Sequence, residues 1–143
     1  MRGALSNLRR DRSGAVIVEF AIVAPFFLAM LCGVLQMGLV MWSYNSMRGI
    51  AADTARFAMI EFQKKKNALT ESDIQDKAVA IAVNSPYGFA IDNFDPHVTK
   101  PASDIAGMTK FQLTITYTPP TALDFTGITA PAMSITRAIY VAT

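Results

Sequence analysis

The hydrophobic pattern starts with an almost unbroken apolar run from Ala15 to Trp42, in which only Glu19 and Gln36 have strongly polar side chains. As a helix, these 28 residues would be about 42 Å long at about 1.5 Å of rise per residue. The hydrocarbon core of a bilayer is about 30 Å thick, so this length is sufficient to cross it. The run therefore predicts a transmembrane helix over residues 15–43.

The helical period continues beyond the apolar run. Apolar residues recur there at steps of three and four: Tyr44, Met47, Ala51, Ala55, Ala58 and Phe62. This spacing is typical of a helix with one buried stripe, so we expect a single helix from about residue 15 to 64. A second helix is predicted from the capping residues Thr70–Asp73 to about Asn84. Its inward positions would be Ile74, Ala78, Ile81 and Ala82.

The last third of the chain alternates between apolar and polar positions. Phe111, Leu113, Ile115 and Tyr117 are separated by Gln112, Thr114 and Thr116, which predicts a half-buried strand over 109–118. Pro119 and Pro120 would end it and begin a loop over 119–131. A second strand is predicted over 134–142, antiparallel to the first, with a short third strand near 94–100. The expected fold is α+β, a long helix packed against a small antiparallel sheet.

The charge distribution and the types of residue present argue against several classes of function. Four of the 13 Lys and Arg residues, but only one of the 11 Asp and Glu residues, lie in residues 1–14, which leaves a formal charge of −1 on residues 15–143. A nucleic-acid partner is not expected because the folded part lacks a basic excess. The chain has a single His, His97, a single Cys, Cys32, and none of the common nucleotide, metalloprotease or hydrolase motifs. We therefore expect no enzyme activity, no metal and no cofactor.

The residues before the apolar run form a short basic leader, 1–14, with Arg9, Arg10 and Arg12 close to the predicted membrane edge. The Lys and Arg bias places this end in the cytoplasm and the residues after about 43 on the other side. The run is longer than the apolar segment of a cleaved secretory signal, so the hydrophobic helix should be retained. Within it, Pro25 lacks a backbone N–H and clashes with the carbonyl of Ala21, which predicts a helix kink.

The segment Gly14-Ala15-Val16-Ile17-Val18-Glu19-Phe20 resembles a class III, type IV pilin-like signal, which a prepilin peptidase cuts after the glycine. The longer string through Ala21-Ile22-Val23-Ala24-Pro25, followed by Gly33 and by Ala51-Ala52-x-x-Ala55-Arg56, is similar to the TadE-like family of Tad (Flp, tight adherence) pilus systems. The resemblance covers roughly residues 10–60. It implies a pilin-like fold and a minor pilin or pseudopilin in the bacterial inner membrane. The implied partners are a prepilin peptidase, other pilin or pseudopilin subunits and the inner-membrane pilus assembly platform, besides the lipid bilayer.

Glu19 is the unusual residue of the span, because an ionisable group near the centre of a membrane helix costs about 2.5–3.5 kcal/mol and less near its edge. A cut between Gly14 and Ala15 would create an ammonium on Ala15, one helical turn before Glu19. The resemblance implies that this pairing, between neighbouring subunits, sets their register during assembly. The domains would then be the leader 1–14, the span 15–43 and an extracytoplasmic domain 44–143. The alternative is an unprocessed single-pass protein whose outer domain binds a partner or a surface polymer.

Overall fold

The computed structural model describes residues 13–65, 68–121 and 130–142. The chain divides into two compact units, Met1–Met37 and Gly38–Thr143, called here the N-terminal and the C-terminal unit. Of the predicted leader, only Ser13 and Gly14 fall within the described residues. Most of the predicted loop over 119–131 also lies outside them, at residues 122–129.

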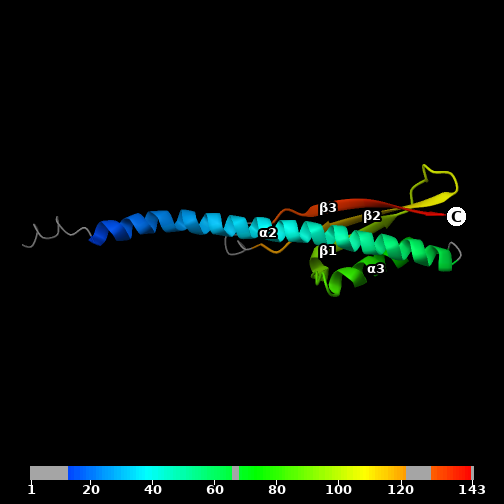
Figure 1. The fold of residues 1–143 in the computed structure, drawn as a ribbon, viewed down its shortest axis with the longest axis horizontal. Coiled ribbons are helices and arrows are strands. Elements are labelled where there is room, and N and C mark those ends of the chain that lie inside the picture. Colours follow the sequence, from blue (N-terminus) through cyan, green and yellow to red (C-terminus); the bar gives the residue numbers. More distant parts are fainter. Residues whose placement is uncertain (1–12, 66–67, 122–129, 143) are drawn as a thin grey trace, which may run out of the picture. The chain divides into compact units, whose positions relative to one another are not determined.

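Helix α2, Ser13–Lys64, is the long helix that the sequence predicts, and it contributes residues to both units (Figure 1). Pro25 lies inside it, and the helix continues both before and after this residue. The kink at Pro25 stays a prediction. Beyond residue 42 the predicted stripe is confirmed at Met47, Ala51, Ala55, Ala58 and Phe62, all of which are buried. Tyr44 is the exception, with 42% of its surface exposed.

Helix α3, Glu71–Val83, begins at the predicted N-cap, Thr70. The Thr70 hydroxyl accepts a hydrogen bond from the Asp73 amide at 3.3 Å, and the Asp73 carboxylate accepts one from the Thr70 amide at 3.0 Å. This reciprocal capping box satisfies backbone donors that a helix start leaves unpaired. The helix gives way to a turn that contains a cis peptide bond before Pro86 and Gly88 at a positive φ of 63°. Glycine suits this left-handed conformation because it has no Cβ.

A short 3-10 helix, η1 (Ile91–Asn93), leads into a three-stranded sheet with the order β1-β2-β3. Its strands are β1 (Phe94–Thr99), β2 (Met108–Tyr117) and β3 (Met133–Ala142). Both neighbouring pairs are antiparallel, and β2 is central, with Thr114 opposite His97 on one side and Thr136 on the other. The three predicted strands and the α+β class are thus confirmed.

The core of the C-terminal unit lies between the inner face of this sheet and the two helices. Phe111, Leu113, Ile115 and Tyr117 of β2 are all buried on that face, as their alternation predicts. Phe62 of α2 meets Phe111 edge to face, with ring centroids 6.2 Å apart. Helix α3 adds Ile74, Ala78 and Ala82, with Ile81 partly buried against the cluster. Amphipathic helices and a one-sided sheet bury their apolar faces against each other in this way.

Candidate functional site

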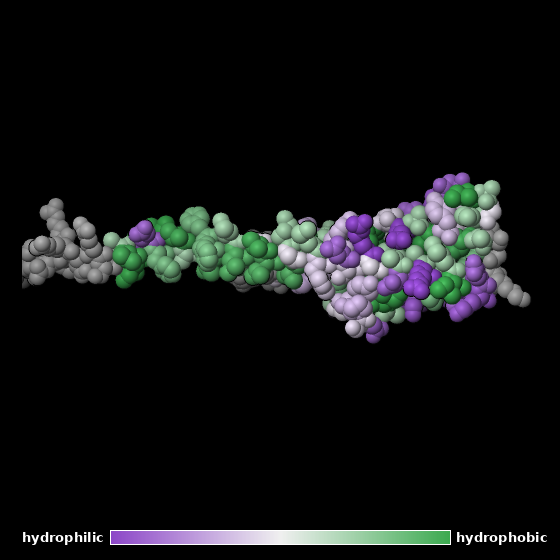
Figure 2. All heavy atoms as spheres, in the orientation of Figure 1, coloured by the Kyte–Doolittle hydropathy of each residue, from purple (hydrophilic) through white to green (hydrophobic). Residues whose placement is uncertain are grey.

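The N-terminal part of α2 presents apolar side chains to its surroundings rather than to a core. Its hydropathy is high enough for a membrane span, and none of its most apolar stretch is buried. Val16, Phe20 and Phe26 expose 66%, 72% and 75% of their surface. Figure 2 shows this surface as a mostly hydrophobic stretch of the helix, whereas polar surface gathers over the C-terminal unit. A helix of this kind is stable where lipid or other apolar helices cover it.

Glu19 lies on this exposed apolar surface. Together with Val16, Phe20 and Val23 it lines a shallow groove of about 270 Å³ along one side of the helix. Ala15 and Glu19 are both exposed and four residues apart, so they occupy the same helix face. The structure thus gives Glu19 an apolar surrounding on the helix surface, with no carboxylate–cation pair formed there by the described residues.

Gly14, the residue before the predicted cut, is not required by packing within the described part of the chain. A Cβ built on Gly14 meets no atom within 4 Å, and the same holds for Gly33. The described surroundings would therefore accept a larger residue at either position. If position 14 needs glycine, the need comes from something that acts on this segment from outside it.

The end of the apolar surface is marked by contacts that belong to the C-terminal unit. Trp42 meets Phe89 edge to face at 5.7 Å, and Ser43 is fully buried. Phe89 in turn stacks on Tyr117 of β2, with ring centroids 4.1 Å apart. The last residues of the predicted span, 42 and 43, therefore take part in the packing of the C-terminal unit as well.

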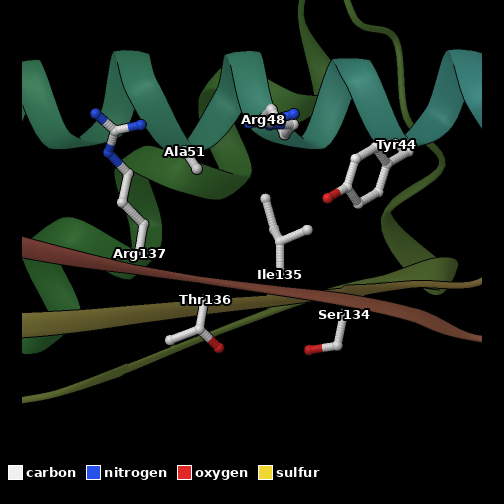
Figure 3. Close-up of a pocket in the computed structure, with 7 residues that line it drawn as sticks. All are labelled: Tyr44, Arg48, Ala51, Ser134, Ile135, Thr136 and Arg137. Carbon is white, nitrogen blue, oxygen red and sulfur yellow. The ribbon is translucent and has the colours of Figure 1, made fainter.

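The structure also brings together residues that no sequence pattern connects. Tyr44, Arg48 and Ala51 of α2 line a groove of about 390 Å³ with Ile135 and Arg137 of β3 (Figure 3). The side chain of Arg137 extends from β3 toward α2, and the hydroxyl of Tyr44 points toward β3. The Arg48 guanidinium lies 5.7 Å from the centre of the Tyr44 ring, within the range of a cation–π contact. No sequence pattern signals this groove, because Tyr44 has the spacing of the buried stripe and departs from it only in the structure.

A second contact that sequence reasoning missed joins α2 to the turn after α3. The Tyr87 hydroxyl donates a hydrogen bond to Asp53 at 3.0 Å, and the ring lies against Gly49. Burial, and then the hydrogen bond to Asp53, raise the pKa of Tyr87 above its ordinary value of 10.0. The turn is thus held against α2 by the packing of the Tyr87 ring on Gly49 and by the hydrogen bond to Asp53.

The remaining polar candidates lie on the sheet and its loops. Asp104 accepts hydrogen bonds from Tyr140 and Lys110, and these, the Tyr140 bond first, hold its pKa below the ordinary value. Within the described ranges, no three His, Cys, Asp or Glu residues come together as a metal ligand set would. His97 lies on the exposed face of β1, opposite Thr114.

These features define an α+β protein with one N-terminal apolar helix that fits a single-pass membrane protein. A family model described as TadE-like protein matches residues 14–56, which confirms the TadE-like resemblance for this segment. The match begins at Gly14 and includes Glu19, Pro25 and the first buried turns of the C-terminal unit. It indicates a protein associated with Tad pili. No curated protein and no solved structure matches the chain.

Proposed function

We propose that this protein is a structural, non-enzymatic minor pilin of the TadE-like type, matured by a prepilin peptidase after Gly14. It would reside in the bacterial inner membrane with the N-terminus in the cytoplasm and the C-terminal unit in the periplasm. From there it would join other pilin subunits and the assembly platform, and enter or prime the pilus. The observation that carries the proposal is an exposed carboxylate on an apolar helix, one turn after the predicted cut.

The physical argument starts from the cost of leaving Glu19 unpaired in lipid. A charge there must be neutralised, paired or drawn to the head groups. Cleavage supplies a partner, because the new ammonium of Ala15 lies on the same helix face four residues earlier. When two such helices pack side by side, the carboxylate of one can meet the ammonium of the next. This pairing offsets much of the burial cost only in the correct register, so it would align the subunits.

Cleavage is tested by the mass and N-terminal sequence of the membrane-extracted protein from cells with an active prepilin peptidase. We expect a mature chain that starts at Ala15. Gly14→Val should keep the leader, whereas Gly33→Val, at an equally open glycine of the same helix, should be cut normally. A wild-type chain that still starts at Met1 would refute the maturation step.

The role of Glu19 is tested separately by following membrane insertion and pilus incorporation in the same cells. Glu19→Ala should leave insertion intact, because it makes the helix more apolar, and should abolish incorporation. Glu61→Ala, on α2 but in the C-terminal unit, is the matched control and should be incorporated normally. Normal incorporation of Glu19→Ala would remove the pairing from the proposal.

A second candidate function is an unprocessed single-pass protein whose C-terminal unit binds a partner. The groove between α2 and β3, with two arginines at its wall, favours a binding role for that unit. If this alternative is correct, Gly14→Val should leave the function of the protein unchanged. If the protein is a processed pilin, Gly14→Val should abolish its function.

A further inference from the structure

We propose that the groove between α2 and β3 receives an extended, acidic segment of a partner protein, which adds as a fourth strand to the open edge of β3. The surface lies in the C-terminal unit and is separate from the predicted cut and from Glu19. The inference goes beyond the pilin proposal and does not depend on processing. Either can therefore fail without the other.

The first argument is charge. Arg48 and Arg137 are both exposed and line the same groove, one from the helix and one from the strand. The ion pairs of the described residues, Lys65 with Asp73 and Lys110 with Asp104, leave both guanidinium groups without a carboxylate. Two cations at one groove repel each other and attract an anion. A carboxylate suits them because guanidinium presents paired N–H donors that match its two oxygens.

The second argument is the free edge of the sheet. In the order β1-β2-β3, strand β3 pairs only with β2, and no other strand of the described ranges lies against its far side. An open edge offers a row of backbone donors and acceptors to another chain. The opposite edge is a poorer site for strand addition, because β1 contains Pro96 and packs against α3. By contrast, β3 has no proline from Met133 to Ala142.

The third argument is that the inner face of β3 is incompletely covered beside the arginines. Ile139 and Val141 are buried, whereas Ile135 is only partly buried and Arg137 is exposed. These residues alternate along the strand and therefore share one face. An added strand would lie next to β3 in the sheet and would place two of its side chains, two residues apart, on the same face beside Ile135 and Arg137. The expected partner segment thus carries an aliphatic residue and an acidic residue at i and i+2, in the manner of strand addition.

The test uses the full-length protein in lipid nanodiscs and a fluorescein-labelled octapeptide that alternates threonine with valine, with one central valine replaced by glutamate. Binding is followed by fluorescence anisotropy at low salt. We expect Arg48→Gln combined with Arg137→Gln to weaken binding by about tenfold, as for two partly exposed charge pairs. Arg56→Gln, at an exposed arginine of α2 outside the groove, should leave binding unchanged.

Two further peptides test the mode of binding without altering the protein. Replacing glutamate by glutamine should weaken binding to a similar degree, and N-methylation of alternate backbone amides should abolish it if the peptide pairs with β3. Equal binding of the glutamate and glutamine peptides, or of the N-methylated peptide, would overturn the proposal. Competition by millimolar inorganic phosphate that fully displaces the peptide would also overturn it, in favour of a simple anion site. Self-association lost in the double variant would identify a second copy as the occupant instead.

Discussion

Gly49 allows the sharpest test of how the C-terminal unit is packed. A Cβ built on Gly49 would lie 2.5 Å from the Tyr87 hydroxyl oxygen, 2.9 Å from its Cε1 and 3.0 Å from its Cζ. The first two distances are shorter than real Cβ contacts and the third is tight, so in Gly49→Ala the Tyr87 ring must move away. When it moves, it gives up its 3.0 Å hydrogen bond to Asp53.

The net effect is a difference between two opposing contributions. Alanine inside a helix is more favourable than glycine by about 0.8–1 kcal/mol. Losing a hydrogen bond to a charged group costs about 1.5–3 kcal/mol. We therefore expect Gly49→Ala to lower the free energy of unfolding by about 0.5–2 kcal/mol. The same substitution at a helix glycine with open space around it would raise the free energy of unfolding. For a unit of about 100 residues, where 1 kcal/mol shifts Tm by about 5 °C, this corresponds to a fall in Tm of about 2–10 °C.

The single tryptophan makes the measurement direct. Trp42 packs against Phe89, two residues beyond Tyr87, so its fluorescence should report unfolding of this region during a urea or thermal titration in detergent. The control is the same substitution in a Tyr87→Ala background, where the obstructing ring is absent. There Gly49→Ala should stabilise by about 1 kcal/mol. The reasoning is refuted if Gly49→Ala stabilises the protein that retains Tyr87, or if its effect is the same in both backgrounds.

Two further predictions concern the core and the start of α3. Phe111→Ala should lower the free energy of unfolding in urea by about 3–5 kcal/mol, because the ring is fully buried against Phe62. The control Phe27→Ala, on the exposed apolar surface, should leave this transition unchanged. A decrease below about 1 kcal/mol for Phe111→Ala would contradict the assigned core. Thr70→Ala should cost about 0.5–2 kcal/mol by removing the cap. Hydrogen bonds from the Thr70 amide and then its hydroxyl hold the pKa of Asp73 below its ordinary value of 3.8, so the stability it contributes is present above about pH 4 and is lost as the pH falls through the lower folded value. Thermal scans from pH 6 to pH 2 should therefore show a smaller acid-induced loss for Asp73→Asn than for the wild type, and an identical loss would contradict the assigned bonds.

The sequence alone determined the elements of this protein, because hydrophobic period is a local property. A three- and four-residue repeat identifies α2 and α3, and alternation at Phe111, Leu113 and Ile115 identifies both β2 and its buried face. The cap at Thr70 was likewise readable, since its donors and acceptors lie within four residues. The candidate site at Gly14, Ala15 and Glu19 belongs to the same category: it is a short linear pattern.

Tertiary structure decided what no local pattern encodes, namely which distant residues meet. Arg48 and Arg137 are 89 positions apart, and Gly49 and Tyr87 are 38 apart, so neither pairing leaves a periodic trace. Tyr44 shows the limit most clearly, because it has the spacing of a buried stripe yet remains exposed. It lines the open groove between α2 and β3, where β3 does not cover the helix. The spacing of residues along the sequence indicates which face of a helix each residue occupies. Whether another element covers that face depends on how the whole chain packs.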